Sequence, residues 1–178
     1  SMRISIHPAN LFTSFGVDGG YQLMRDNGVE AIQFGMGAYV MSRKVILQKQ
    51  PNVMDGTMDE IMAYVQPYKE AAEKYNVQFS QVHAPFPSYV PGDEEINARM
   101  QKVLIKTIEM TARLGCRQLV VSPPHMESVF ERITPEDEER WMMEQYVPLI
   151  PHLKKHKVMC MLENLFNRGV EGQRYACD

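Results

Sequence analysis

The sequence predicts an α/β fold in which five parallel strands alternate with four helices. Short apolar runs recur along the chain, and a segment with helical periodicity follows each of the first four. The runs at residues 119–121 and 158–162 are too uniformly apolar for strands with one face in water, so both of their faces are expected to be buried. No repeat, low-complexity tract or internal linker is visible, which predicts that residues 1–178 form one structural unit.

The first half of the pattern is less regular than the second. Strands are expected at residues 3–7, 29–34, 78–83, 117–122 and 157–163. The first helix is expected over residues 19–27 and ends at Gly28, because glycine readily adopts the left-handed conformation that terminates helices. Residues 35–55 are polar, contain glycine and lack clean periodicity, which predicts a long loop or a partial helix over one end of the fold.

The second and third helices start with recognisable caps. Thr57 and Glu60 fit a capping box that opens a helix running to Tyr75. Asp93 is the expected N-cap of the next helix, which Gly115 ends.

The last helix is expected to start at Thr134, with Pro135 in its first turn. It is expected to run to about residue 153. Pro148 and Pro151 should break or kink it late, because proline removes a helical N–H donor and clashes with the preceding turn.

Composition excludes several classes of protein. A net charge of −3 and an isoelectric point near 6.0 give no basic stripe that would hold nucleic acid. Cys116, Cys160 and Cys177 lack a CxxC spacing, which favours free thiols and a cytoplasmic location. The chain opens directly into a strand without a leader-like segment, and no apolar run approaches the roughly 18 residues of a membrane span.

Two residues at strand ends are candidates for chemistry. Glu163 closes one apolar run and His83 closes another. In parallel α/β barrels the carboxyl ends of the strands form the active face, so the two are expected to share a site. A carboxylate buried at this position needs a compensating partner, and a divalent cation such as Mg²⁺ or Mn²⁺ is one. The alternative is a structural Glu163 that pairs with an arginine or with backbone amides.

Histidines recur at other strand ends. His7 precedes Pro8 after the first strand, and His125 follows Ser122 and two prolines after the fourth. The proline after Ala84 should fix the direction of the His83 ring, as a substrate or metal contact requires. The alternative is a core histidine with both ring nitrogens satisfied.

The order of the strand-end motifs resembles the xylose isomerase-like barrel family, which includes sugar phosphate isomerases, ketose epimerases and apurinic endonucleases. The motifs are V-H-A-P at 82–85, L-V-V-S-P-P at 119–124 and M-L-E-N at 161–164. The resemblance implies an incomplete TIM-type (β/α)8 barrel, of which the chain carries the first five strands.

The resemblance also implies roles for single residues. Glu163 matches a residue that serves as metal ligand and as catalytic acid or base, while the remaining ligands lie beyond residue 178. His83 and His7 would line the substrate site. Asn167 and Arg168 resemble an Asn-Arg substrate-binding pair that is common in the epimerases after this glutamate, although here the pair is shifted along the sequence.

Two positions depart from the family pattern. Ser122 stands where the endonucleases carry a zinc-binding histidine, which favours a single-metal isomerase or epimerase. Gln33 stands where the family often has an acidic residue.

The function that the resemblance implies is a metal-dependent sugar or sugar phosphate isomerase or epimerase, acting by proton transfer next to a carbonyl. The expected cation is Mn²⁺ or Mg²⁺, with Zn²⁺ or Co²⁺ as alternatives. A phosphodiester hydrolase of the apurinic endonuclease type and a non-catalytic fragment are the competing hypotheses. The 178 residues alone are expected to be inactive and to bind metal poorly. Five strands leave open edges, so either copies associate into a homo-oligomer or these residues belong to a longer polypeptide that completes the barrel.

Overall fold

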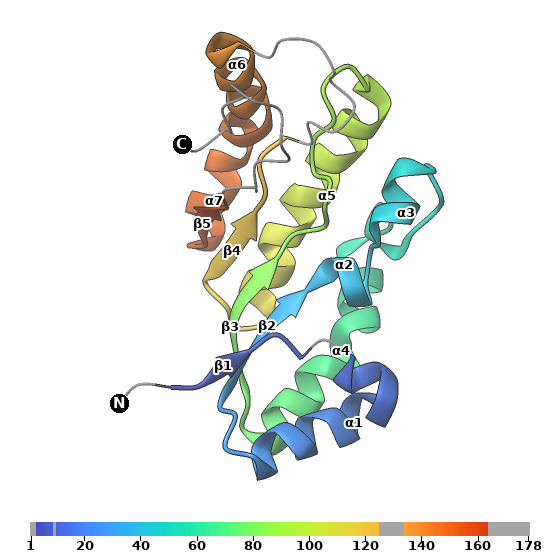
Figure 1. The fold of residues 1–178 in the computed structure, drawn as a ribbon, viewed down its shortest axis with the longest axis vertical. Helices are drawn as coiled ribbons and strands as arrows, with labels where there is room; N and C mark the ends of the chain where they lie inside the picture. Colours follow the sequence, from blue (N-terminus) through green and yellow to red (C-terminus); the bar gives the residue numbers. More distant parts are fainter. Residues whose placement is uncertain (1–2, 9, 125–133, 164–178) are drawn as a thin grey trace, which may run out of the picture.

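A five-stranded parallel sheet forms the centre of the molecule (Figure 1). The structure is a computed structural model that describes residues 3–8, 10–124 and 134–163. The strands lie in chain order, each beside the next, which confirms the predicted parallel α/β fold. They are β1 (Ser5–Ile6), β2 (Ala31–Gly35), β3 (Gln78–His83), β4 (Gln118–Val121) and β5 (Met159–Leu162).

Long helices connect consecutive strands. They are α1 (Leu11–Asp26), α4 (Met58–Tyr75), α5 (Glu94–Arg113) and α6 (Pro135–Tyr146). A 3₁₀ turn, η2 (Val147–Leu149), joins α6 to α7 (Ile150–His156). Between β2 and α4 lie short pieces, which are α2 (Met36–Tyr39), α3 (Arg43–Leu47) and the 3₁₀ turn η1 (Val53–Asp55). No helix in the described ranges has the length and apolar character needed to cross a membrane.

The strand register separates two faces of the sheet. Phe34, Val82 and Leu119 are paired across β2, β3 and β4, and all three are fully buried in the core formed with α4 and α5. Gly35 and His83 are the next pair, so they lie on the opposite face. This opposite face, called the inner face below, carries the candidate residues.

Local capping follows the sequence closely. Thr57, Asp93 and Thr134 all accept a hydrogen bond from the backbone amide three residues on, as N-caps do, which confirms the predicted helix starts. The predicted break near Pro148 and Pro151 is also confirmed, because η2 interrupts the helix there. The resumed helix ends at His156, three residues later than expected.

The first helix starts earlier than residue 19, where the sequence predicts its start, so that prediction is wrong. Helix α1 begins at Leu11, and Gly16 with a φ of 71° kinks it. Its first turn is held by tertiary packing, since the Phe12 ring lies 5.0–5.3 Å from the rings of Tyr21, Tyr39 and Tyr68. Strand β1 is also shorter than predicted, whereas the segment predicted at residues 35–55 to be a long loop or a partial helix contains α2, α3 and η1 and so is the partial helix.

The prediction that both faces of the strand are buried is largely confirmed for β4 and wrong for β5. Met159 is 64% exposed and Leu162 is 50% exposed. The physical reason is the position of the strand, because β5 pairs with β4 on one side and with no other strand in the described part of the chain.

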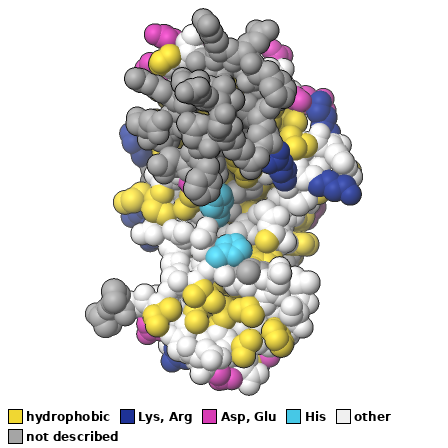
Figure 2. All heavy atoms as spheres, viewed as in Figure 1, with side chains coloured by type: hydrophobic (Ala, Val, Ile, Leu, Met, Phe, Trp, Pro, Cys, Tyr) yellow, Lys and Arg dark blue, Asp and Glu magenta, His cyan; other side chains and the backbone are white. Residues whose placement is uncertain are grey.

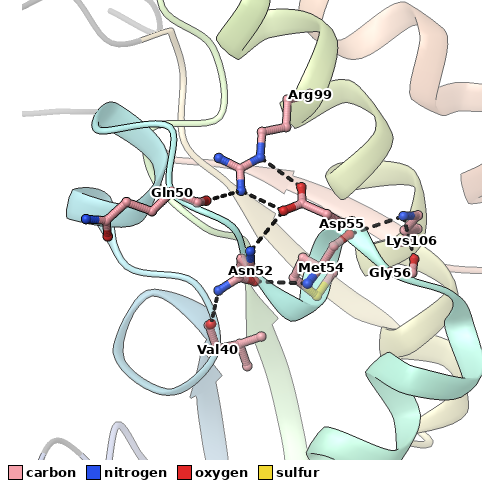
Figure 3. A network of polar contacts seen from close by, with 8 residues as sticks. All are labelled: Val40, Gln50, Asn52, Met54, Asp55, Gly56, Arg99 and Lys106. Atoms are coloured by element: carbon pink, nitrogen blue, oxygen red, sulfur yellow. Dashed lines mark hydrogen bonds and ion pairs between the residues drawn. The ribbon is translucent and has the colours of Figure 1, made fainter.

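The segment between β2 and α4 is attached to α5 by a polar network (Figure 3). Arg99 donates from Nε and Nη2 to the Asp55 carboxylate, at 2.8 Å each, and also to the Gln50 carbonyl. Lys106 donates to the carbonyl oxygens of Met54 and Gly56. Cys116 and Cys160 are free thiols, in agreement with the expectation from their spacing, and Cys177 lies outside the described residues.

Candidate active site

Polar side chains gather where the strands of the sheet end. His7 follows β1, His83 ends β3, Ser122 follows β4 and Glu163 follows β5. Because all strands are parallel, these ends lie along one edge of the sheet. Figure 2 shows histidine side chains at the surface in the middle of the view, with hydrophobic side chains near them.

His83 and Glu163 are in direct contact. The Nε2 atom of His83 lies 3.0 Å from Oε2 of Glu163, although β4 separates their strands. The Nδ1 atom of His83 lies 2.9 Å from the carbonyl oxygen of Ala84. The predicted juxtaposition of the two side chains is confirmed by this contact, whereas their catalytic roles stay predictions.

The contacts of the His83 ring define where a proton can lie. A carbonyl oxygen only accepts hydrogen bonds, so Nδ1 of His83 carries a proton and donates it to Ala84. A hydrogen bond between Nε2 and the Glu163 carboxyl group needs one further proton, held on either of the two atoms. The pair is therefore able to hold or transfer a proton at the carboxyl edge of the sheet.

Ser122 supplies the second contact to the same oxygen. Its hydroxyl group donates to Oε2 of Glu163 over 2.9 Å. The backbone amide of Glu163 in turn donates to the carbonyl oxygen of Val121, which aligns the ends of β4 and β5. Main-chain pairing and two side chains thus restrict the orientation of the carboxylate.

The expectation that Glu163 is buried is wrong for the described part of the chain. Its side chain is 41% exposed, whereas that of His83 is 22% exposed. Compensation comes from the hydroxyl of Ser122 and the ring of His83. The exposed part of Glu163 leaves the carboxylate accessible to a small ligand.

His7 lies over the end of β2. A Cβ atom added to Gly35 would lie 2.8 Å from Nε2 of His7, so the ring occupies the space that a side chain would need there. Gly35 is paired with His83 in the sheet. His7 and His83 therefore approach the same part of the edge from neighbouring strands, and the absence of a side chain at Gly35 permits it.

The remaining candidates are placed as follows. Gln33 is paired with Gln81, two residues before the Gly35 and His83 pair, and so lies on the same inner face of the sheet. Asn167, Arg168 and His125 lie outside the described residues.

The donor types suit a divalent cation, although the described residues supply only part of a site. A carboxylate oxygen and an imidazole nitrogen are ordinary ligands of Mn²⁺ and Zn²⁺, and carboxylates also bind Mg²⁺. Among the described residues, no three His, Cys, Asp or Glu side chains come together in a way that could hold a metal ion. Glu163 and His83 thus fit such a site in kind, and further ligands would have to come from elsewhere.

The contact of Ser122 with Glu163 is not evident from the sequence motifs. They mark Ser122 only as a departure from the endonuclease pattern, yet its hydroxyl contacts Glu163. Its position one residue past β4, next to a strand that ends in Glu163, is the feature that points to this contact. The packing of Gly35 against His7 has no counterpart in the sequence pattern.

Comparison with protein families matches residues 22–176 to the xylose isomerase-like TIM barrel. The chain belongs to this family. Membership confirms the resemblance that the strand-end motifs indicated. A comparison with curated proteins found no match.

Solved structures share the fold of this xylose isomerase-like chain. A D-tagatose 3-epimerase-like protein has a TM-score of 0.62 at 17% identity, with 96% of this chain and 56% of that chain covered. A putative xylose isomerase from Rhodospirillum rubrum ATCC 11170 has a TM-score of 0.64 at 15% identity, with coverages of 91% and 53%. The IolI protein, described with a bound zinc atom, has a TM-score of 0.56 at 16% identity, with coverages of 90% and 51%.

The coverage defines how much of the barrel is present. The chain spans about half the length of these structures, and its five parallel strands correspond to a partial TIM barrel. The predicted fold class is confirmed.

Proposed function

We propose that this xylose isomerase-like chain carries part of the active site of a metal-dependent sugar or sugar phosphate isomerase or epimerase. The observation that supports it is the contact of Glu163 with His83 and Ser122 at the carboxyl edge of the sheet. Proton transfer next to a carbonyl needs a positioned carboxylate or imidazole within reach of the substrate. Glu163 is accessible and held in orientation, as this role requires.

Each residue has a role in this proposal. Glu163 removes and returns the carbon-bound proton and is also a metal ligand. His83 and His7 contact hydroxyl or carbonyl oxygens of the sugar, because both lie beside the glycine at the end of β2. Asn167 and Arg168, outside the described residues, complete the substrate contacts.

A divalent cation is part of the proposed site. Mn²⁺ or Mg²⁺ is favoured, with Zn²⁺ or Co²⁺ as alternatives, and the zinc atom described for the IolI protein is consistent with a metal in this family. When bound, such a cation supplies positive charge that polarises a carbonyl or hydroxyl oxygen. Glu163 is the described residue that would contact it.

The proposal also covers the substrate, the partners, the cellular location and the oligomeric state. The substrate is a small sugar, as for the D-tagatose 3-epimerase-like relative, with no nucleic acid or membrane as partner. A cytoplasmic location and a homo-oligomer remain predictions. The competing phosphodiester hydrolase has less support, because the end of β4 presents the Ser122 hydroxyl, engaged with Glu163, in place of a zinc-binding histidine.

Hydrogen exchange from solvent into the sugar tests the function directly. The chain, in the longest form that its gene encodes, is incubated in D₂O with a panel of ketoses and ketose phosphates and, in separate samples, Mn²⁺, Mg²⁺, Zn²⁺ or Co²⁺. Proton NMR follows the carbon next to the carbonyl. We expect deuterium to enter one of these sugars, and EDTA to stop the exchange. A folded protein that exchanges none of them with any of the four cations would contradict the proposal. Cleavage of bis(p-nitrophenyl) phosphate instead would establish the hydrolase.

A further inference from the structure

A path of hydrogen bonds connects helix α6 to Glu163. Gln145, near the end of α6, donates from Nε2 to the carbonyl oxygen of Ser122 over 3.1 Å. The hydroxyl group of Ser122 donates to Oε2 of Glu163 over 2.9 Å. We propose that Gln145 is a positioning residue that orients Glu163 through Ser122. The proposal rests on the proposed function only for what Glu163 does once it is oriented.

Ser88 contributes a further hydrogen bond to the Ser122 carbonyl oxygen. Its hydroxyl group donates to the Ser122 carbonyl oxygen over 3.3 Å, and it accepts a hydrogen bond from Nε2 of Gln145. Gln145 is 4% exposed, Ser88 is 2% exposed and Ser122 is 4% exposed. Water therefore has little access to compete for these hydrogen bonds, and the three groups restrain one another.

The hydrogen-bonding capacity of each group fixes the orientation of the Gln145 amide. The Ser122 carbonyl only accepts, so the nitrogen and not the oxygen of the amide must face it. The two hydrogens of Nε2 are then used on Ser122 and Ser88. The amide oxygen, Oε1, is left buried without a hydrogen-bond partner among the described residues.

The hydrogen-bond donor distinguishes Gln145 from an apolar residue of similar size. An apolar side chain would fill the same volume but could not donate to the Ser122 carbonyl oxygen. The Gln145 amide therefore restrains the main chain just past β4, at the residue whose hydroxyl contacts Glu163.

The Ser122 carbonyl oxygen needs hydrogen-bond donors from outside the sheet because Ser122 lies just past β4. The sheet pairing ends at the carbonyl of Val121, which accepts from the Glu163 amide, so the Ser122 carbonyl is outside the ladder. Pro123 follows and has no N–H to contribute. The carbonyl and the side chain of Ser122 diverge from one Cα atom, so holding the carbonyl restricts where the hydroxyl group can point.

The ring nitrogens of His83 report on this arrangement without any substrate or metal. Nitrogen-15 NMR of the 178-residue chain is recorded, and the His83→Gln variant identifies the His83 signals. Ser122→Ala removes the hydroxyl directly, while Gln145→Met keeps a similar volume but cannot donate. We expect both to shift the His83 Nε2 resonance in the same direction. The double variant should shift it no further than Ser122→Ala alone.

Two outcomes would overturn the proposal. One is a Gln145→Met protein with the wild-type His83 resonances while Ser122→Ala shifts them. The other is additive shifts in the double variant, because additivity shows that Gln145 does not act through Ser122. Met143→Ala, at an exposed site on α6, is the control that should leave the resonances unchanged.

A second variant covers the case in which Gln145→Met does not fold. Ser88→Ala removes the other donor to the same carbonyl, and a smaller shift in the same direction is expected. An unchanged spectrum would count against the proposal. The measurement involves no turnover, so a failed sugar assay leaves this result standing, and a failed positioning test leaves the sugar assay standing.

Discussion

At the carboxyl end of β5, Glu163 keeps 41% of its side chain exposed while Oε2 accepts from Ser122 and lies 3.0 Å from His83. The contacts limit the rotamers of the carboxylate, and the exposure leaves it accessible to a ligand. A general base needs both properties, because it must reach a carbon-bound proton in a defined geometry. Hydrogen bonds, and not burial, hold the carboxylate in this orientation.

At the same scale, Gly35→Ala should move His7. The new Cβ would lie 2.8 Å from Nε2 of His7, which is the far end of a flexible side chain, so the ring is expected to move while the sheet stays intact. The free energy of unfolding should change by less than about 1 kcal/mol. Carbon-13 NMR of the histidine rings, together with a thermal melt, measures both effects.

Gly37→Ala is the matched control, because an added Cβ there meets nothing within 4 Å. It should leave the His7 signals in place. Unchanged His7 signals in Gly35→Ala would show that the ring does not occupy the space above the end of β2.

At the scale of elements, the segment between β2 and α4 depends on the ion pair of Asp55 with Arg99 (Figure 3). The Arg99 guanidinium group lowers the pKa of the Asp55 carboxyl below its ordinary value. Because the pKa is lower in the folded state, the stabilisation is fully present above the unfolded pKa of about 3.9 and is lost as the pH falls through the folded pKa.

Asp55→Asn should therefore destabilise the protein at pH 7 and have less effect in acid. The Asp55 side chain is 40% exposed and that of Arg99 is 19% exposed, so solvent screening limits the loss to about 1 kcal/mol. Urea unfolding at pH 7 and at pH values below 4 measures the difference from the wild type. Asp26→Asn, at the exposed end of α1, should change stability by no more than about 0.5 kcal/mol. A loss for Asp55→Asn that grows in acid would contradict this account.

Elements whose boundaries depend on local sequence were predictable. The caps at Thr57, Asp93 and Thr134 lie within four residues of the groups that they satisfy, so a sequence window contains the whole interaction. The first turn of α1 was not predictable, because the aromatic rings around Phe12 hold it from distant parts of the chain. The contact of Arg99 with Asp55 also spans 44 residues and leaves no periodic pattern.

The same distinction applies to the candidate site. His83 and Glu163 could be found from sequence, because each ends an apolar run and parallel strands bring such ends together. Gln145 could not, since its place on α6 reads as an ordinary polar position and its partner is 23 residues away. The partial exposure of Glu163 was missed because it depends on which strand flanks β5.

At the scale of the whole molecule, the described sheet is open at β1 and at β5. Ile4 is 59% exposed and Met159 is 64% exposed near these edges. Open strand edges with exposed apolar side chains favour association, and this chain covers only 51–56% of the solved structures that share its fold. The 178-residue chain alone is expected to associate and to bind Mn²⁺ weakly.

Sedimentation equilibrium should accordingly give a mass above 20.5 kDa for the 178-residue chain. Met159→Lys places a charge at the β5 edge and should shift the protein toward monomer, because edge lysines disfavour pairing between sheets. Met143→Lys, 55% exposed on α6, should leave the association unchanged. A stable wild-type monomer that binds Mn²⁺ tightly in calorimetry would contradict both expectations.

In the proposed mechanism Glu163 performs the proton transfer, and Glu163→Gln removes that capacity. Glutamine keeps the size and the acceptor oxygen for Ser122 but cannot remove a proton. With Mn²⁺ present, deuterium entry into the sugar that the wild type exchanges should fall by a factor of about 10² to 10⁴. Glu139→Gln, exposed on α6, should exchange at the wild-type rate. A folded Glu163→Gln protein that exchanges as fast as the wild type would show that Glu163 does not transfer the proton.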